Sequence, residues 1–246
     1  MKNQLISILL CLFFIPANAQ ESLNQTDKTG KKQGVWKKHY ENGQLRYEGR
    51  FLDDAPTGTF RYYQETGELK MVSVYSNKGH LARTTGFDKK GNLISSGNYI
   101  DQKKDSTWVY FDQKKNKIAQ EQYNKGVRIG VWLSYYPGGQ VSEEMPYENN
   151  QRHGTGKQYF ENGKLMLSAV YVNDKLEGNM RIYYPNGEVK QSGFYKNDVR
   201  EGLWHSFHEN GALKESVKYK NGLSDKKDEI KLKPLNKPES EILPEQ

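Results

Sequence analysis

The sequence of 246 residues has a single cysteine and no apolar run long enough to cross a lipid bilayer. A multi-span membrane protein is therefore excluded, since a spanning helix needs ~18 or more apolar residues in succession. Apolar residues make up only 35% of the chain, and the mean hydropathy is −0.95. Such a polar composition excludes the large buried core of an α/β enzyme.

The chain is rich instead in tyrosine and glycine, with 17 and 23 residues. A disordered polyelectrolyte is poor in aromatic residues, so this composition indicates a chain that folds. Many tyrosines and glycines with few apolar residues favour short β-strands joined by tight turns, with most residues at a surface.

The one strongly apolar stretch lies at the N-terminus, from Leu5 to Ile15, after Lys2 and before Ala17-Asn18-Ala19. This pattern predicts a signal peptide over residues 1–19, cleaved after Ala19, and hence an exported protein of the periplasm or the outer cell surface. An uncleaved N-terminal membrane anchor is the alternative. Because Cys11 lies inside this run, the mature chain would have no disulfide and no thiol chemistry.

An internal repeat of 24 residues covers residues 34–225 as eight units without insertion or deletion. One position in each unit, called the anchor here, is aromatic in five of the eight: Trp36, Phe60, Thr84, Trp108, Trp132, Gly156, Met180 and Trp204. Fifteen residues later every unit has a terminal aromatic: Phe51, Tyr75, Tyr99, Tyr123, Tyr147, Tyr171, Tyr195 and Tyr219. The spacing predicts one structural unit repeated eight times.

Every unit except the fourth has a glycine seven residues after the anchor, and in the first unit it forms the hairpin signal Asn42-Gly43. This dipeptide predicts a two-residue type I′ turn, because both central residues of that turn need a positive φ. The register then predicts three facing pairs: Tyr40 with Leu45, Lys38 with Tyr47 and Trp36 with Gly49. It also predicts glycines beneath the anchors of their own units: Gly49, Gly97 and Gly193.

Three units depart from this pattern and are expected to be the least regular. The fourth unit has Lys115 and Lys117 where the others have the turn glycine and a leucine or valine, and Ile118 one place later suggests a β-bulge. The third and sixth units have Thr84 and Gly156 in place of an anchor ring or methionine.

A single hairpin cannot bury enough surface to be stable in water, so the units must stack. The predicted fold is all-β: an elongated single-layer antiparallel sheet of about eight stacked hairpins. Sixteen strands would extend over roughly 75 Å.

A second row of rings lies three residues after the anchor, where alternation along a strand points it to the opposite face. Either a bulge turns this row inward, or the second face is a binding surface. The candidate surface consists of Tyr63, Phe87, Phe111, Tyr135, Tyr159, Tyr183 and Phe207.

The repeat resembles the bacterial variant of the MORN repeat. The fifth unit shows the shared positions: Gly130, Trp132, Tyr135, Tyr136, Gly139, Glu144 and Tyr147. The resemblance implies an elongated array of hairpins that acts as a scaffold or protein-binding surface and, in some members, binds acidic lipids. Many bacterial variants are labelled antitoxin components of toxin–antitoxin modules.

The flanking segments, a polar lead over residues 20–33 and a tail over residues 226–246, are expected to be unstructured. No catalytic or metal site is predicted: His205 and His208 would point to opposite faces of a strand, as would Glu143 and Glu144. No cofactor is expected. The net charge of +7 is spread without a dense basic cluster, so no nucleic acid is expected as a partner.

The sequence thus predicts a non-enzymatic, exported repeat protein that binds a protein partner in the cell envelope through an extended aromatic β-surface. Three alternatives stay open: an antitoxin that neutralises a toxin by direct binding, a cell-wall glycan binder and an acidic-lipid binder. Affinity capture from the envelope, polysaccharide pull-down and salt-dependent vesicle binding distinguish them.

Overall fold

The computed structural model describes residues 22–225, so the predicted signal peptide and tail lie outside the described residues. The described part is all-β apart from one 3-10 turn, η1 (Asn77–Gly79). Its strands are β1 (Gln25–Thr26), β2 (Lys32–His39), β3 (Leu45–Leu52), β4 (Ala55–Tyr63), β5 (Leu69–Ser76), β6 (Leu81–Phe87), β7 (Leu93–Ile100), β8 (Lys103–Phe111), β9 (Lys117–Asn124), β10 (Val127–Arg128), β11 (Gly130–Tyr135), β12 (Val141–Glu148), β13 (Gln151–Arg152), β14 (Gly154–Tyr159), β15 (Leu165–Val172), β16 (Lys175–Tyr183), β17 (Val189–Lys196), β18 (Val199–Phe207), β19 (Leu213–Lys220) and β20 (Leu223–Ser224).

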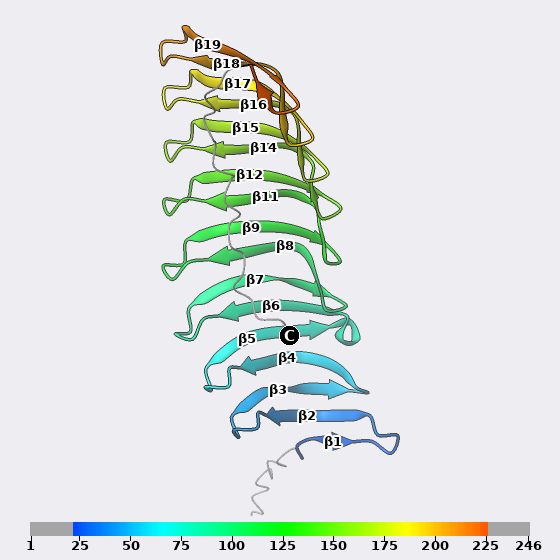
Figure 1. Ribbon diagram of the computed structural model, residues 1–246. Coiled ribbons are helices and arrows are strands. Elements are labelled where there is room, and N and C mark those ends of the chain that lie inside the picture. Colours follow the sequence, from blue (N-terminus) through cyan, green and yellow to red (C-terminus); the bar gives the residue numbers. More distant parts are fainter. Residues whose placement is uncertain (1–21, 226–246) are drawn as a thin grey trace, which may run out of the picture.

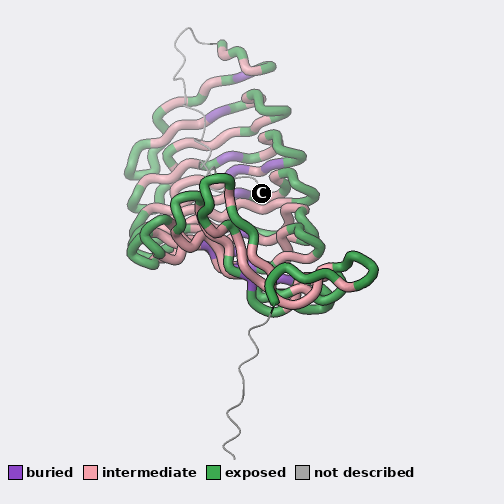
Figure 2. The backbone as a smooth tube through the Cα atoms, turned by 90° about the horizontal axis from the view of Figure 1, so that it is seen from below, coloured by how far each residue is buried: buried purple, intermediate pink, exposed green. Residues whose placement is uncertain are grey.

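The strands follow one another in chain order, each antiparallel to its neighbour, and form one elongated open sheet (Figure 1). Hairpin turns line both long edges of the sheet, where exposed residues gather, while the buried positions lie in the strands between them (Figure 2). The predicted fold class is therefore confirmed.

The turn inside each unit differs from the predicted type I′ turn. The Gly43 N–H donates to the Tyr40 carbonyl at 3.0 Å, and the Tyr40 N–H donates to the Gln44 carbonyl at 2.8 Å. Only Gly43 of the Asn42-Gly43 pair has a positive φ, 83°. This geometry is a type I turn followed by a left-handed glycine, the usual three-residue hairpin loop.

The longer loop moves the register next to the turn by one residue. His39, not Tyr40, faces Leu45, so that predicted pair is wrong. The register shift lies between Lys38 and His39, and beyond it the predicted pairs Lys38 with Tyr47 and Trp36 with Gly49 are confirmed. An extra residue in β3 absorbs the difference as a bulge.

Type I′ turns occur on the opposite edge, where one unit leads into the next. Asp53 and Asp54 have φ values of 53° and 69° and form a two-residue loop between Leu52 and Ala55. The Asp54 carboxylate accepts the Lys32 N–H at 2.8 Å, which ties this turn to the beginning of β2. Asparagine and aspartate tolerate the left-handed conformation because their short side chains bond locally.

The fourth unit keeps the geometry of the others despite its lysines: the bulge expected there is present between Tyr110 and Phe111, and the other seven hairpins have the same bulge. Lys115 adopts a φ of 66° in place of glycine, and Lys117 faces Phe111 as the leucines face the equivalent residues. The Asp112 carboxylate stabilises the turn by accepting the N–H groups of Lys114 and Asn116, both at 2.8 Å.

The lead is partly ordered, contrary to expectation. Within it β1 pairs with β2, and the Asp27 carboxylate accepts two backbone N–H groups and the Thr29 hydroxyl. These hydrogen bonds, led by that of Thr29, lower the pKa of Asp27 from 3.8 to about 2.

Most junctions between units contain a second irregularity, a two-residue shift of register. At the junction of β3 and β4 it lies between Glu48 and Arg50, and Gly58, two residues before the anchor, has a φ of 65°. The other residues at that position with a positive φ are Gly34, Ser106, Gly130, Gly154, Gly178 and Gly202. Among the described junctions, only that of β5 and β6 pairs without a shift, and there Ala82 replaces the glycine.

Candidate binding surface

One face of the sheet, called the anchor face here, has side chains that pack against one another. It bears the anchors and the terminal aromatics. Phe60, Trp108 and Trp204 are no more than 2% exposed. Burial of such large rings in a single layer is possible because each covers a glycine of the neighbouring strand.

The glycine beneath each ring belongs to the preceding unit, which corrects the expectation. Gly49 faces Trp36 across its own hairpin, but the ring that covers it is Phe60 of the next unit. A Cβ at Gly49 would lie 2.4 Å from that ring. Trp108 covers Gly97 and Trp204 covers Gly193 in the same way. The rings therefore join successive units rather than close single hairpins.

In the sixth unit neighbouring side chains fill the space of the missing anchor ring. A Cβ at Gly156 would lie 2.9 Å from Met145 and 3.0 Å from Tyr171. The unit keeps the common register, so its expected irregularity is absent.

Cations cover the rings of the anchor face. The Lys104 ammonium lies 5.0 Å from the centroid of Trp108, and the Arg200 guanidinium lies 4.3 Å from that of Trp204. Equivalent contacts occur at Lys32, Arg128 and Arg152. Each is a cation–π interaction within reach of ~6 Å, so these rings are already partnered inside the chain.

The fourth unit adds a buried polar cluster to this face. The Glu121 carboxylate, 7% exposed as a residue, accepts the hydroxyls of Tyr110 at 2.6 Å and Tyr123 at 2.9 Å. The Lys104 ammonium lies 3.7 Å from Glu121. Burial and the nearby carboxylate raise the pKa of both tyrosines well above the usual value. Burial lowers the pKa of Lys104 and outweighs the carboxylate, which raises it. The polar groups of this cluster are therefore paired with one another.

The second row of rings lies on the opposite face, called the ring face here. The Tyr63 hydroxyl donates to Glu48 at 3.1 Å, and Glu48 pairs with Lys37, which points away from its neighbour Trp36. At the other end of the array, Phe207 lies beside His205, with ring centroids 6.2 Å apart. A bulge does precede the ring row, as between Tyr62 and Tyr63, but it does not turn the rings inward.

All seven rings of the candidate surface are half-buried. The backbone beneath three of them is held from the preceding unit, where a tyrosine hydroxyl donates to a ring residue's carbonyl: Tyr40 to Tyr63, Tyr136 to Tyr159 and Tyr184 to Phe207. The row is thus fixed in position while part of each ring faces solvent.

A second apolar row on the ring face was not predicted. It follows the edge with the type I′ turns and includes Val74 (48% exposed), Val131 (41%), Phe194 (40%) and Leu203 (55%). These residues stand one place before an anchor or one place before a terminal aromatic. Strand alternation from the anchors would have placed them on this face.

A polar row separates the two apolar rows. Lys37 and Arg61 lie 3.2 and 4.0 Å from the Glu48 carboxylate, and Lys157 lies 3.3 Å from Glu144. Partial burial would raise the pKa of Glu48, but hydrogen bonds from Lys37 and Tyr63 outweigh it and lower that pKa. These ion pairs are exposed enough to add little stability.

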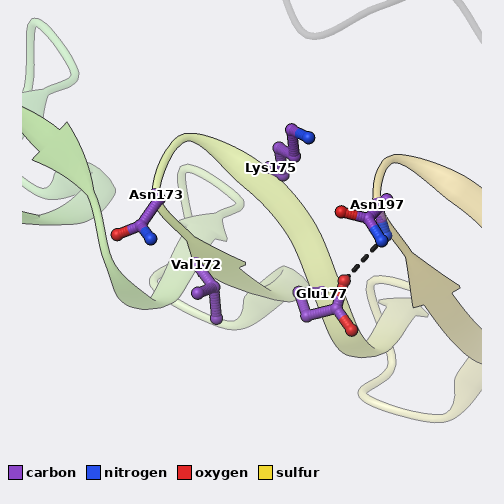
Figure 3. A pocket seen from close by; sticks show the side chains of 5 residues that line it. All are labelled: Val172, Asn173, Lys175, Glu177 and Asn197. Carbon is purple, nitrogen blue, oxygen red and sulfur yellow. Dashed lines mark hydrogen bonds between the residues drawn. The ribbon is translucent and has the colours of Figure 1, made fainter.

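The hollows of the described surface are shallow. One of about 370 Å³ lies at the type I′ edge between Val172, Asn173, Lys175, Glu177 and Asn197 (Figure 3). The Asn197 N–H donates to the Glu177 carboxylate there at 2.7 Å. Within residues 22–225 no three histidine, cysteine, aspartate or glutamate side chains gather in a way that could hold a metal ion. No helix in that range is long and apolar enough to span a membrane.

Comparison with known proteins assigns the repeat. The profile described as "MORN repeat variant" matches residues 32–53, 128–149, 152–173, 176–197 and 200–221. All five matches begin four residues before an anchor, so they are in phase with the 24-residue unit. The chain is a MORN-repeat variant protein.

Other comparisons add little. No curated protein sequence matches the chain. The crystal structure of TarM aligns with a TM-score of 0.26 at 18% identity, over 48% of this chain and 19% of TarM. A mutant of S. aureus TarM in complex with fondaparinux, alpha-GlcNAc-glycerol and UDP gives 0.24 and 17%, over 49% and 19%. The chain thus spans about a fifth of TarM, and likenesses this slight carry no argument about function.

Proposed function

We propose that this chain is an exported, non-enzymatic scaffold that binds a protein partner in the cell envelope through the ring face. One observation carries the proposal: seven half-buried rings stand in register on one face, and among the described residues a cation of the chain lies over only one of them, Tyr135, whose ring centroid is 5.1 Å from the Lys117 ammonium. Aromatic side chains are the commonest energetic anchors of protein interfaces. A preformed row costs little to order on binding.

The experiment that tests the proposal compares two neighbouring residues of β11. A photo-reactive benzoylphenylalanine replaces Tyr135 on the ring face or, as the control, Ser134 on the anchor face. After irradiation of the native cells, we expect a protein adduct from position 135 and none from position 134. Equal adducts from both positions, or adducts only with glycan or lipid, contradict the proposal.

A further inference from the structure

The junction of the second and third units differs from the other described junctions, because β5 and β6 pair without a register shift. Ala82 stands where those junctions have a residue with a positive φ. The two residues that form the bulge elsewhere lie in the turn instead, so the pair Ser76 and Leu81 closes a four-residue loop. Bulges increase the local twist of a sheet, and the regular ladder here therefore gives a flatter patch.

A shallow groove of about 410 Å³ lies over this patch. Its apolar lining comes from Val74, Leu81 and Ile100, which stand on the ring face in adjacent strands. Val74 is 48% exposed and Leu81 39%. Exposed apolar side chains gathered in one place are a usual mark of an interaction site.

The groove lining contains one cation, Arg83, and one anion, Asp105. Arg83 lies across from both Val74 and Asn98, is exposed, and makes no hydrogen bond or ion pair with any residue of the described chain. The neighbouring Asp105 is already occupied, because its carboxylate accepts the Ser106 hydroxyl at 2.8 Å and the Lys125 N–H at 3.0 Å. The groove thus offers a guanidinium beside apolar walls. A guanidinium of this kind favours a carboxylate, which it can bind through two parallel hydrogen bonds.

The family profile matches the first unit and the last four, but not the three units that contain the groove. The sequence around the groove therefore departs from the common repeat at the place where the backbone does. Units that only extend the array have no structural need for such a departure.

We propose that this groove takes an extended segment of the protein partner in which an acidic side chain stands beside apolar ones. The apolar side chains would lie against Val74, Leu81 and Ile100, and the carboxylate would pair with Arg83. The proposal rests on the proposed function and assigns a subsite within the ring face.

The test is selection of random displayed peptides on the full chain, followed by affinity measurement with the most enriched peptide. We expect enriched sequences with aspartate or glutamate next to apolar residues. Arg83→Glu should weaken binding of that peptide at least tenfold. The matched control is Arg181→Glu, an exposed ring-face arginine opposite serines, which should change it by less than twofold.

Two results would overturn the proposal: enrichment of peptides without acidic residues, or equal affinity for the wild type and Arg83→Glu. An unchanged urea midpoint shows that Arg83→Glu folds. If the photo-adduct from position 135 survives while the peptide results fail, the scaffold function stands and the subsite is wrong. If the peptide results hold and no adduct forms, the groove binds its segment and the extended surface is wrong.

Discussion

Because Trp204 packs on Gly193, the effect of Gly193→Ala on the free energy of unfolding should change sign when the tryptophan ring is removed. A Cβ at position 193 would lie 2.1 Å from Trp204 Cδ2, far inside ordinary contact, and the atoms it meets belong to the body of the ring. Gly193→Ala must therefore displace the tryptophan. Overpacking of this kind costs about 1–3 kcal/mol.

Another pair of units in the array shows which residue can replace the ring so that Gly193→Ala is no longer destabilising. In the second and third units the equivalent positions hold Ser73 and Thr84, both buried, with their hydroxyl oxygens 2.9 Å apart. With Trp204→Thr the ring is gone, and Gly193→Ala should instead raise the free energy of unfolding by about 0.5–1 kcal/mol, because glycine within a strand is less stable than alanine.

Urea unfolding followed by far-ultraviolet circular dichroism measures all four proteins of this double-mutant cycle. The same penalty for Gly193→Ala in both backgrounds would refute the packing argument.

Three further predictions concern stability. Ser106 has a φ of 57°, so Ser106→Gly should raise the free energy of unfolding by about 0.5–1 kcal/mol, since the left-handed region disfavours residues with a Cβ; a lower thermal midpoint would contradict this. Lys104→Met should lower the free energy of unfolding by about 2 kcal/mol, because Glu121 stays buried without its cation. The double variant with Glu121→Gln should recover most of the loss, because the amide oxygen can still accept the tyrosine hydroxyls without a buried charge. Urea midpoints measure both effects, and a lasting loss in the double variant counts against the prediction. The folded pKa of Asp27 is lowered from 3.8 to about 2, so its contribution is present above about pH 4 and is lost as the pH falls toward 2. Acid titration of the melting temperature should show a smaller decline in that window for Asp27→Asn, and identical curves would contradict the assignment.

The repeat and its register could be predicted because both arise from local patterns. The position of the turn places Trp36 opposite Gly49 without knowledge of any other unit, because the bulge in β3 offsets the extra residue of the loop. The loop type could not be read from Asn42-Gly43, since the glycine suits a two-residue and a three-residue loop equally well.

Contacts between units escaped prediction because they depend on how one hairpin lies against the next. The pattern shows that Gly193 is small but not that the ring above it is Trp204 of the following unit. The register shift before most anchors has a local signal, usually a glycine two residues earlier, as at Gly58. That this glycine marks the register shift can be recognised only in the structure, at the one described junction where Ala82 replaces the glycine and the shift is absent.

The candidate surface was predicted as a row of rings, but one bulge in each unit left its direction undecided. Counting alternate residues from Phe60 to Tyr63 places Tyr63 on the ring face, where the structure has it. The same count from the anchors would have predicted the exposed apolar row that contains Val131 and Leu203. The groove at Arg83 had no comparable signal, because it results from the absence of an irregularity.

Hydroxyl-radical footprinting of the tyrosines, compared between the purified chain and the native envelope, tests most directly whether the two faces divide packing from recognition. The ring-face tyrosines should be oxidised in the purified chain and become protected in the envelope: Tyr63, Tyr135, Tyr159 and Tyr183. The anchor-face tyrosines should react weakly and equally in both: Tyr123, Tyr171 and Tyr219. Protection confined to the anchor face, or no change on the ring face, would contradict the account.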